Sequence, residues 1–328
     1  MAVEPLPAAL LTEGRAMVAA VAADLARLKN VQTTLLSDYR LTPGVDCCEV
    51  RCVASEAGAE IVFDQVAAAA DLTLVIAPER DGALTDRCRR VLDCGGRLVG
   101  PGLEIVELCG DKQRAAEHLA AAGVPAPLGM PLGKGEALPA DFPYPAVLKP
   151  RDGCGSHGVQ FLSTCTEAAR LGIAPWPARL ERFCPGLAAG VAVMSGPREI
   201  RALPACWQRL PDDGRFEYLG GALPLPSSLA GRAEALALRA IQSLPEPCGY
   251  IGVDLVLGER AGEIADDYVI EINPRLTTSY VGLRAACRGN LAEAMLRIAQ
   301  GEPAELSFRD DPLQFDADGT VRFLQGKP

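Results

Sequence analysis

The apolar segment 269–275 contains three polar side chains whose spacing suits metal and phosphate chemistry: Glu271, Asn273 and Arg275. Side chains in a strand alternate between its two faces, so Glu271 and Asn273 point to the same side. A carboxylate and a carboxamide, with no thiolate or imidazole beside them, are oxygen ligands of the kind that Mg²⁺ prefers. Pro274 has no N–H for a sheet ladder, so we expect the strand to end there and to leave these groups at a rim.

A second acid stands in the apolar segment 250–258, where Asp254 is the one charged residue. The polar stretch 259–267 separates the two segments, and this pattern predicts a hairpin with a long loop. Asp254 would then lie across from Glu271 and Asn273 and complete a set of three oxygen ligands. The alternative is a pair of solvated acids on a half-exposed hairpin, since acids are mostly exposed. The continuously apolar runs favour strands covered on both faces, where an acid needs a partner or a metal.

A glycine-rich loop lies between two further predicted strands. Gly153, Gly155 and Gly158 follow the strand 145–150, and 159–162 has the composition of another strand. A dinucleotide-binding loop would lead into a helix, so this context favours a flap whose backbone N–H groups close over phosphates. Lys149 precedes the loop in an otherwise apolar strand, where it needs an anionic partner, and Ser156 could donate to a phosphate. An ordinary hairpin with a lysine that reaches solvent is the alternative.

Composition narrows the class of protein. The chain has 328 residues, with 49% hydrophobic and 23% charged residues, which is ordinary for a globular protein of two or three domains. Its net charge of −10 argues against a nucleic-acid-binding protein. The twelve cysteines include no C-x-x-C pair and there are two histidines, so we expect no zinc site. This many scattered thiols suggests that the protein is located in the reducing cytoplasm. The sequence contains no run that we expect to span a membrane.

The elements that position these residues form two regions. In the first, helices at 14–30, 61–70 and 88–94 alternate with strands at 31–36, 48–53, 72–77 and 97–99. This order predicts an α/β domain with a parallel sheet over residues 1–110. Its strand ends at Asp38 and Glu79 are where such sheets present ligand groups.

The second region starts at Asp111, a helix N-cap before the helix 112–122. Further strands are expected at 178–183 and 190–194, and helices at 166–172, 229–243 and 290–299. The tail from about 304 is polar.

Together these segments resemble the ATP-grasp superfamily of carboxylate–amine ligases, over about 111–300. The resemblance implies that Lys112 and Lys149 bind nucleotide phosphates under the flap. It implies that Glu181 and Phe183, in the hinge segment 180–186, meet the adenine. It further implies lobes at 111–183 and 184–328 after the N-terminal α/β domain, with Asp254, Glu271 and Asn273 binding Mg²⁺ or Mn²⁺ and Arg275 steadying the acyl phosphate. One departure is that residues 187–189, Leu-Ala-Ala, replace the acid that many members use for the ribose.

Within the superfamily, 273–284, 216–221 and 76–79 resemble the tyramine–glutamate ligase group of methanofuran biosynthesis. This implies ATP-dependent amide formation from a carboxylate and an amine, in one-carbon cofactor biosynthesis. Glu79, Tyr280 and Arg284 are then candidates for contact with the substrate, although a packing ring and a surface salt bridge explain Tyr280 and Arg284 equally well. The partners expected are a small-molecule acid and amine, with a homodimer as one option for the assembly. The alternatives are a phosphotransferase or carboxylase-type enzyme, and a nucleotide-binding module without catalysis.

Overall fold

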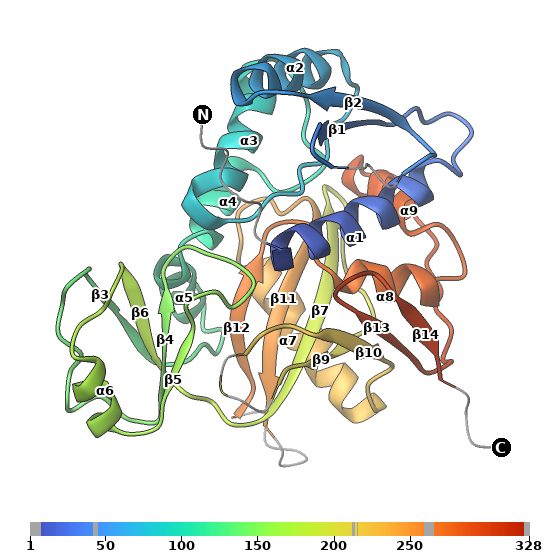
Figure 1. The fold of residues 1–328 in the computed structure, drawn as a ribbon. Helices are drawn as coiled ribbons and strands as arrows, with labels where there is room; N and C mark the ends of the chain where they lie inside the picture. The colour runs from blue at the N-terminus through green and yellow to red at the C-terminus, as the bar shows by residue number, and fades with distance from the viewer. Residues whose placement is uncertain (1–7, 42–44, 212–213, 215, 259–265, 325–328) are drawn as a thin grey trace.

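The computed structural model describes residues 8–41, 45–211, 214, 216–258 and 266–324. Within these residues the strands form sheets of two, four and eight strands, and the four-stranded sheet stands apart from the eight-stranded one at the side of the molecule (Figure 1). The N-terminal region lies above the larger sheet in the same view. In the described part of the chain no helix is long and apolar enough to cross a membrane.

The N-terminal region is a small α/β unit, preceded by a long helix. Its elements are α1 (Ala8–Leu25), β1 (Thr34–Asp38), β2 (Glu49–Val53), α2 (Glu56–Ala69), the short 3-10 turn η1 (Arg80–Gly82), α3 (Ala83–Asp93) and α4 (Leu103–Cys109). Strands β1 and β2 pair in parallel, as expected for such a domain.

The predicted strands 72–77 and 97–99 are not strands in the structure. The two segments meet only at one isolated parallel bridge, between Thr73 and Leu98. The apolar residues of segment 72–77 are buried on two sides: Leu74 and Ile76 pack on one core cluster, and Val75 and Ala77 pack on another. Burial on both sides thus gave a strand-like pattern without a ladder.

The four-stranded sheet carries the glycine-rich loop. Its strands are β3 (Gly129–Leu132), β6 (Ala178–Arg182), β4 (Ala146–Pro150) and β5 (Gln160–Leu162), in that order and all antiparallel. Helix α5 (Lys112–Ala121) begins at Asp111, whose side chain accepts hydrogen bonds from the backbone of Gln113 and Arg114, and α6 (Cys165–Leu171) follows β5. The loop joins two antiparallel strands, so the predicted strand–loop–strand context is confirmed.

The eight-stranded sheet carries the acids. Along the sheet the order is β12 (Tyr268–Asn273), β11 (Gly249–Leu257), β7 (Leu187–Gly196), β9 (Cys206–Arg209), β10 (Gly220–Leu223), β13 (Leu313–Asp316) and β14 (Val321–Phe323), and β8 (Glu199–Ala202) pairs with β7. The helices of this part are α7 (Ser227–Gln242), α8 (Ser279–Ala286) and α9 (Leu291–Ala299). Strands β11 and β12 are the predicted antiparallel pair, and most of the loop between them, 259–265, lies outside the described residues.

The hinge between the sheets is a short segment, 183–186, that leaves β6 and enters β7. Gly186 has a φ of +155°, and a Cβ there would lie 2.4 Å from the carbonyl oxygen of Leu257. A glycine is therefore required where the chain crosses from one sheet to the other.

The C-terminal segment, although polar in composition, forms two further strands of the large sheet. Strands β13 and β14 form a hairpin on the edge of the large sheet, and Leu313 and Phe315 are fully buried. They belong to the core cluster that also holds Met17 and Val21 of α1. Helix α1 also begins at Ala8 rather than at residue 14, and it packs against α8 and α9.

Candidate active site

A cavity of about 330 Å³ lies between the two large sheets, beneath the glycine-rich loop. This is within the usual range for a small-molecule site. The residues predicted for the site that line it are Lys112, Lys149, Gly153, Gly155, Ser156, Glu181, Phe183, Asp254, Glu271, Asn273 and Arg275. Four predicted residues are not part of its lining: Glu79, Gly158, Tyr280 and Arg284.

The hairpin of β11 and β12 places the acids on one face. Asp254 lies opposite Glu271, a register shift follows Asp254, and Gly252 lies opposite Asn273. The Asn273 side chain donates a hydrogen bond of 2.9 Å to Asp254, and Gln208 of β9 donates one of 2.6 Å to its other oxygen. Burial and repulsion from Glu271 raise the pKa of Asp254 to about 6.

The donor set of this hairpin fits a hard divalent cation, because two carboxylates and a carboxamide offer oxygen atoms alone. In the described residues no three His, Cys, Asp or Glu side chains gather as a metal-holding group, and the cluster here has two acids with Asn273 as its third member. Asp254 and Glu271, with Asn273, are thus the residues that would hold Mg²⁺.

Two lysines face this hairpin from the smaller sheet and from α5. The Lys112 Nζ lies 2.7 Å from a Glu271 oxygen and donates to the Gly153 carbonyl at 2.7 Å. Burial alone would lower the pKa of Lys112, but Glu271 outweighs that effect and raises it. Conversely, burial would raise the pKa of Glu271, but Lys112 and Lys149 lower it. Glu271 is therefore a charged carboxylate, although it is largely buried.

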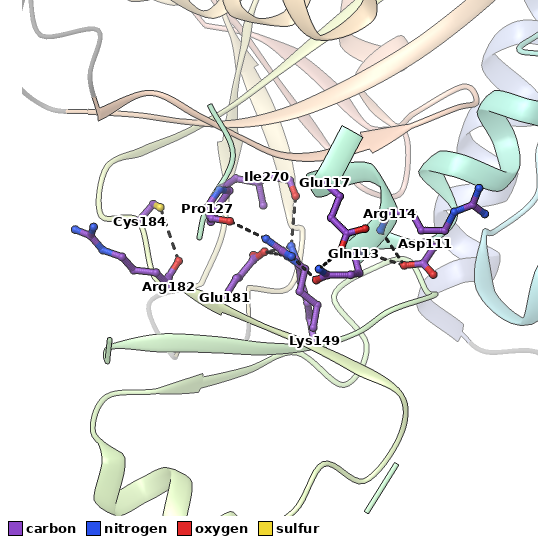
Figure 2. Close-up of polar contacts among 11 residues, drawn as sticks. Asp111, Gln113, Arg114, Glu117, Pro127, Lys149, Glu181, Arg182, Cys184 and Ile270 are labelled. Atoms are coloured by element: carbon purple, nitrogen blue, oxygen red, sulfur yellow. Dashed lines mark hydrogen bonds and ion pairs between the residues drawn. The ribbon is translucent and has the colours of Figure 1, made fainter. Parts of the chain in front are cut away.

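Lys149 lies between β6, the strand that leads into the hinge, and β12, which carries Glu271 and Asn273 and is called the metal strand below. Its Nζ is 2.6 Å from a Glu181 oxygen and donates to the Ile270 carbonyl at 3.3 Å, and Figure 2 shows the side chain reaching toward both groups. Glu181 also accepts a 2.8 Å hydrogen bond from Arg179, and both carboxylate oxygens are thus paired with cations. Both lysines line the cavity, so each presents a cationic group to it.

The glycine-rich loop adopts a conformation that its glycines allow. Gly153, Gly155 and Gly158 have φ values of +140°, +64° and +80°, where residues with a side chain are rare. Ser156 also has a positive φ, 57°, and its hydroxyl donates a 2.5 Å hydrogen bond to the carbonyl of Phe216. The structure thus ties Ser156 to the segment before β10, whereas the sequence suggested a phosphate contact.

Arg275 lies just beyond the metal strand and joins it to the N-terminal region. Its guanidinium donates two hydrogen bonds to the Glu79 carboxylate, at 2.9 Å and 3.0 Å. Glu79 is 6% exposed and does not line the cavity, so its carboxylate orients Arg275 and does not face a substrate there. Arg275 itself lines the cavity close to Thr277 and Thr278.

Tyr280 and Arg284 do not reach the cavity. Both contact Asp24 of α1: the Tyr280 hydroxyl donates to it at 2.8 Å, and the Arg284 guanidinium donates to it at 3.0 Å and 2.7 Å. Asp24 is 2% exposed, so this is a buried lock between α1 and α8. These contacts are of the kind named as the alternative for the two residues, a packing ring and a salt bridge.

The hinge end of the cavity holds the residues expected near an adenine. Glu181 and Phe183 both line it, and the Phe183 ring meets Phe161 edge-on with centroids 5.0 Å apart. At the ribose position Ala188 lines the cavity, which offers no acid. Among the polar residues of the lining that sequence reasoning did not assign to the site are Gln208 and Glu13. Neither carries a local signal, because Gln208 is neutral in a four-residue strand and Glu13 lies in a helix far from the motifs.

Comparison with known proteins agrees with this architecture. A model of the ATP-grasp domain matches residues 109–279, and a model of the pre-ATP-grasp domain matches 31–106. The chain belongs to the ATP-grasp family, which confirms the predicted fold of an N-terminal α/β domain followed by a two-lobed ATP-binding unit.

Named relatives span most of the chain. It is 24% identical over 246 residues to tyramine–L-glutamate ligase of Methanocaldococcus fervens, which covers 75% of this chain and 71% of that protein. Among solved structures, an ATP-grasp superfamily protein of Archaeoglobus fulgidus superposes with a TM-score of 0.73 at 19% identity, covering 95% of this chain and 88% of the other. The L-amino acid ligase of Bacillus licheniformis superposes with a TM-score of 0.70 at 18% identity, covering 91% and 76%. These likenesses at low identity show the fold.

Proposed function

We propose that the protein is an ATP-dependent ligase that joins a carboxylate to an amine, releasing ADP and phosphate. One observation carries this proposal: two lysines, a carboxylate–carboxamide set and an arginine face a single cavity from opposite lobes. Lys112 and Lys149 come from the small lobe side, and Asp254, Glu271 and Arg275 from the large one. Opposite charges placed this way suit phosphoryl transfer, where positioning and charge neutralisation supply most of the catalysis.

In the proposed reaction a carboxylate oxygen of the acid substrate attacks the γ-phosphorus of ATP, and the bond to the β–γ bridging oxygen breaks. The nitrogen of the amine then attacks the acyl carbon, the bond from that carbon to the phosphate oxygen breaks, and the nitrogen loses a proton. Lys112 and Lys149 bind phosphate oxygens, and Arg275 binds the transferred phosphoryl group through its planar fork. Mg²⁺ on Asp254, Glu271 and Asn273, with Mn²⁺ as a substitute, would offset phosphate charge. The glycine loop, with Gly153, Gly155 and Gly158, would exclude water from the acyl phosphate.

The finer proposal concerns the substrates. Similarity to tyramine–L-glutamate ligases over most of the chain supports glutamate as the acid and an amine such as tyramine as the acceptor. We accordingly place the reaction in the biosynthesis of a methanofuran-like cofactor, in the cytoplasm. The boundaries 1–110, 111–183 and 184–328 remain our division of the chain into an N-terminal domain and two lobes, and a homodimer is our proposal for the assembly.

The test incubates purified protein with ATP, Mg²⁺, glutamate and a panel of amines, and measures ADP together with the amide product. We expect ADP release that depends on both the acid and the amine. Glu271→Gln should abolish this turnover while the far-ultraviolet circular dichroism stays unchanged, because the variant keeps the side-chain size and loses the charge that binds the metal. Glu293→Gln, at an exposed position of α9, is the matched control and should remain active.

Two results would contradict the proposal. ADP release that requires bicarbonate instead of an amine would indicate a carboxylase-type enzyme. Full turnover by Glu271→Gln would show that the hairpin does not bind the metal.

A further inference from the structure

Helix α1 contributes a carboxylate to the cavity. Glu13 lines the cavity wall, and its oxygen accepts a 3.1 Å hydrogen bond from the hydroxyl of Thr278, a buried residue three positions after Arg275. Helix α1 precedes both segments that match family models, 31–106 and 109–279. Glu13 therefore lies outside the segments that define the two matched domains.

The position of Glu13 is fixed by the packing of α1. Asp24, near the other end of this helix, holds Tyr280 and Arg284 of α8, and its backbone carbonyl accepts a 2.7 Å hydrogen bond from Asn290. At the N-terminal end, Leu10 lies against the glycine-rich loop, since a Cβ on Gly155 would be 3.3 Å from its Cδ2. Figure 1 shows this end of α1 beside that loop. Glu13 is thus held on a rigid helix at the edge of the flap.

Charge pairing sets Glu13 apart from Glu181 and Glu271, the two cavity acids that pair with lysines. Glu271 and Glu181 lie within 2.7 Å of Lys112 and Lys149 respectively. In the described part of the chain, Glu13 and Asp254 are the two part-buried acids of the lining that have no cation within 4.0 Å. Asp254 belongs to the donor set for a divalent metal, which leaves Glu13 without a charge partner.

The surroundings of Glu13 disfavour a free carboxylate. Burial raises its pKa, and the carboxylate of Glu217 acts in the same direction. Arg275, the one cation that acts on Glu13, already donates two hydrogen bonds to Glu79. A partly desolvated carboxylate in such a place gains most from a cation that arrives with the ligand.

The location indicates which part of the ligand this is. The hinge residues Glu181 and Phe183 line the cavity where β6 leads toward β7. Glu13, in contrast, contacts Thr278, five positions after the end of β12, and is close enough to Arg275 for that charge to act on its pKa. In the proposed reaction the acid and the amine must meet beyond the terminal phosphate, on the side of Arg275. A group bound by Glu13 is therefore part of a substrate other than the nucleotide.

We propose that Glu13 binds a substrate ammonium group and thereby selects cationic substrates. This inference rests on the proposed ligase function and adds the residue that distinguishes cationic substrates from uncharged ones. The ammonium group can belong to the amine acceptor before it loses its proton, or to the α-amino group of an amino-acid substrate. Glu13 acts as a specificity-determining residue in both cases.

The test compares the wild type with Glu13→Gln, which removes the charge and keeps an oxygen that can accept from Thr278. Glu293→Gln, on the exposed side of α9, controls for loss of an acid elsewhere. Each protein is assayed with the amine and, separately, with hydroxylamine, a nucleophile that is uncharged at neutral pH and gives a hydroxamate. We expect the KM of the cationic substrate to rise roughly 10- to 100-fold in Glu13→Gln, and the KM of ATP to stay within about twofold.

The hydroxylamine arm identifies the source of the ammonium group. If Glu13 binds the acceptor, Glu13→Gln loses affinity for the amine and keeps normal hydroxamate formation. If it binds the α-amino group of the acid, the KM of the acid rises with both nucleophiles. Unchanged KM values for both substrates, or a parallel rise for ATP, would overturn the inference.

A binding arm separates failure of this inference from failure of the proposed function. Wild type that forms neither amide nor hydroxamate with any acid would refute the ligase proposal. Calorimetry of wild type and Glu13→Gln with Mg²⁺ and ADP, titrated with glutamate and with tyramine, still tests Glu13. Tighter binding by the wild type supports the ammonium contact, and equal or absent binding overturns it.

Discussion

The pair of Arg275 and Glu79 offers a test that separates a structural role from a role in the reaction. Arg275 follows β12 and Glu79 lies in the N-terminal region, so the two hydrogen bonds between them, at 2.9 Å and 3.0 Å, join the two parts of the chain. The Glu79 side chain is 3% exposed and that of Arg275 is 13% exposed. Removing the guanidinium would leave a buried, unpaired carboxylate.

We expect Arg275→Met to lower the free energy of unfolding by roughly 3–5 kcal/mol, which is the usual cost of breaking a buried ion pair from one side. The double variant Arg275→Met with Glu79→Leu should recover most of this loss, because an apolar pair can replace a buried ion pair at little cost. Urea denaturation followed by tryptophan fluorescence measures both values, and ADP release measures activity. Both variants should be inactive, since Arg275 lines the cavity.

Two outcomes would refute this reasoning. A double variant that regains stability and also turns over substrate would mean that Arg275 serves only to join the N-terminal region to the metal strand. An Arg275→Met protein that unfolds at the same urea concentration as the wild type would mean that the pair is not buried in the way its exposure indicates. Glu79→Gln alone should keep part of the activity, because the guanidinium remains in the cavity.

Three further expectations concern the metal, the nucleotide and the core. The pKa of Asp254 is raised to about 6, so its charged form is lost as the pH falls through about 6; Mg²⁺-dependent nucleotide binding should therefore be weaker at about pH 5 than at about pH 7.5, as measured by calorimetry at both values. In the protein without metal the sign for stability is the opposite, since the raised pKa of this acid makes its ionisation destabilising as the pH rises through the same window. Lys149→Ala should weaken ADP binding by at least about tenfold, because a phosphate ligand is lost; Glu181 keeps its bond to Arg179, so the melting temperature should change little, and equal ADP affinity would contradict the role of Lys149. Phe315→Ala should cost roughly 3–5 kcal/mol of stability, since the ring is fully buried, and a change below about 1 kcal/mol would show that the C-terminal hairpin is not part of the core.

The local parts of the site could be predicted because their signals are local. Asp254, Glu271 and Asn273 stand in strands whose alternation fixes which side chains share a face, and the hairpin register follows from their proximity along the chain. The same holds for Lys149 and the glycine-rich loop, where two strands flank glycines that need positive φ. In each case a few neighbouring residues specify both the backbone and the direction of the side chains.

The contacts between distant segments could not be predicted in this way. Glu79 and Arg275 are separated by 196 positions, and Asp24 lies 256 positions before Tyr280. The spacing of Tyr280 and Arg284 on α8 does not indicate that both side chains point toward α1 and away from the cavity. The strand β13 was missed for a related reason, because a strand of four residues with two apolar side chains is too short for a periodic pattern to stand out.

The charge pairs of the cavity imply that metal and phosphate bind in a coupled manner. Glu271 is the partner of Lys112, and it also belongs to the oxygen set for the metal. A divalent cation on Glu271 competes with Lys112 for that carboxylate, and a phosphate on Lys112 competes with Glu271 for the ammonium group. Each ligand therefore releases the group that the other needs, and thermodynamic linkage requires the two affinities to rise together by the same factor. The short distance that joins Lys112 to Glu271 is thus the structural reason to expect a nucleotide to bind as its metal complex.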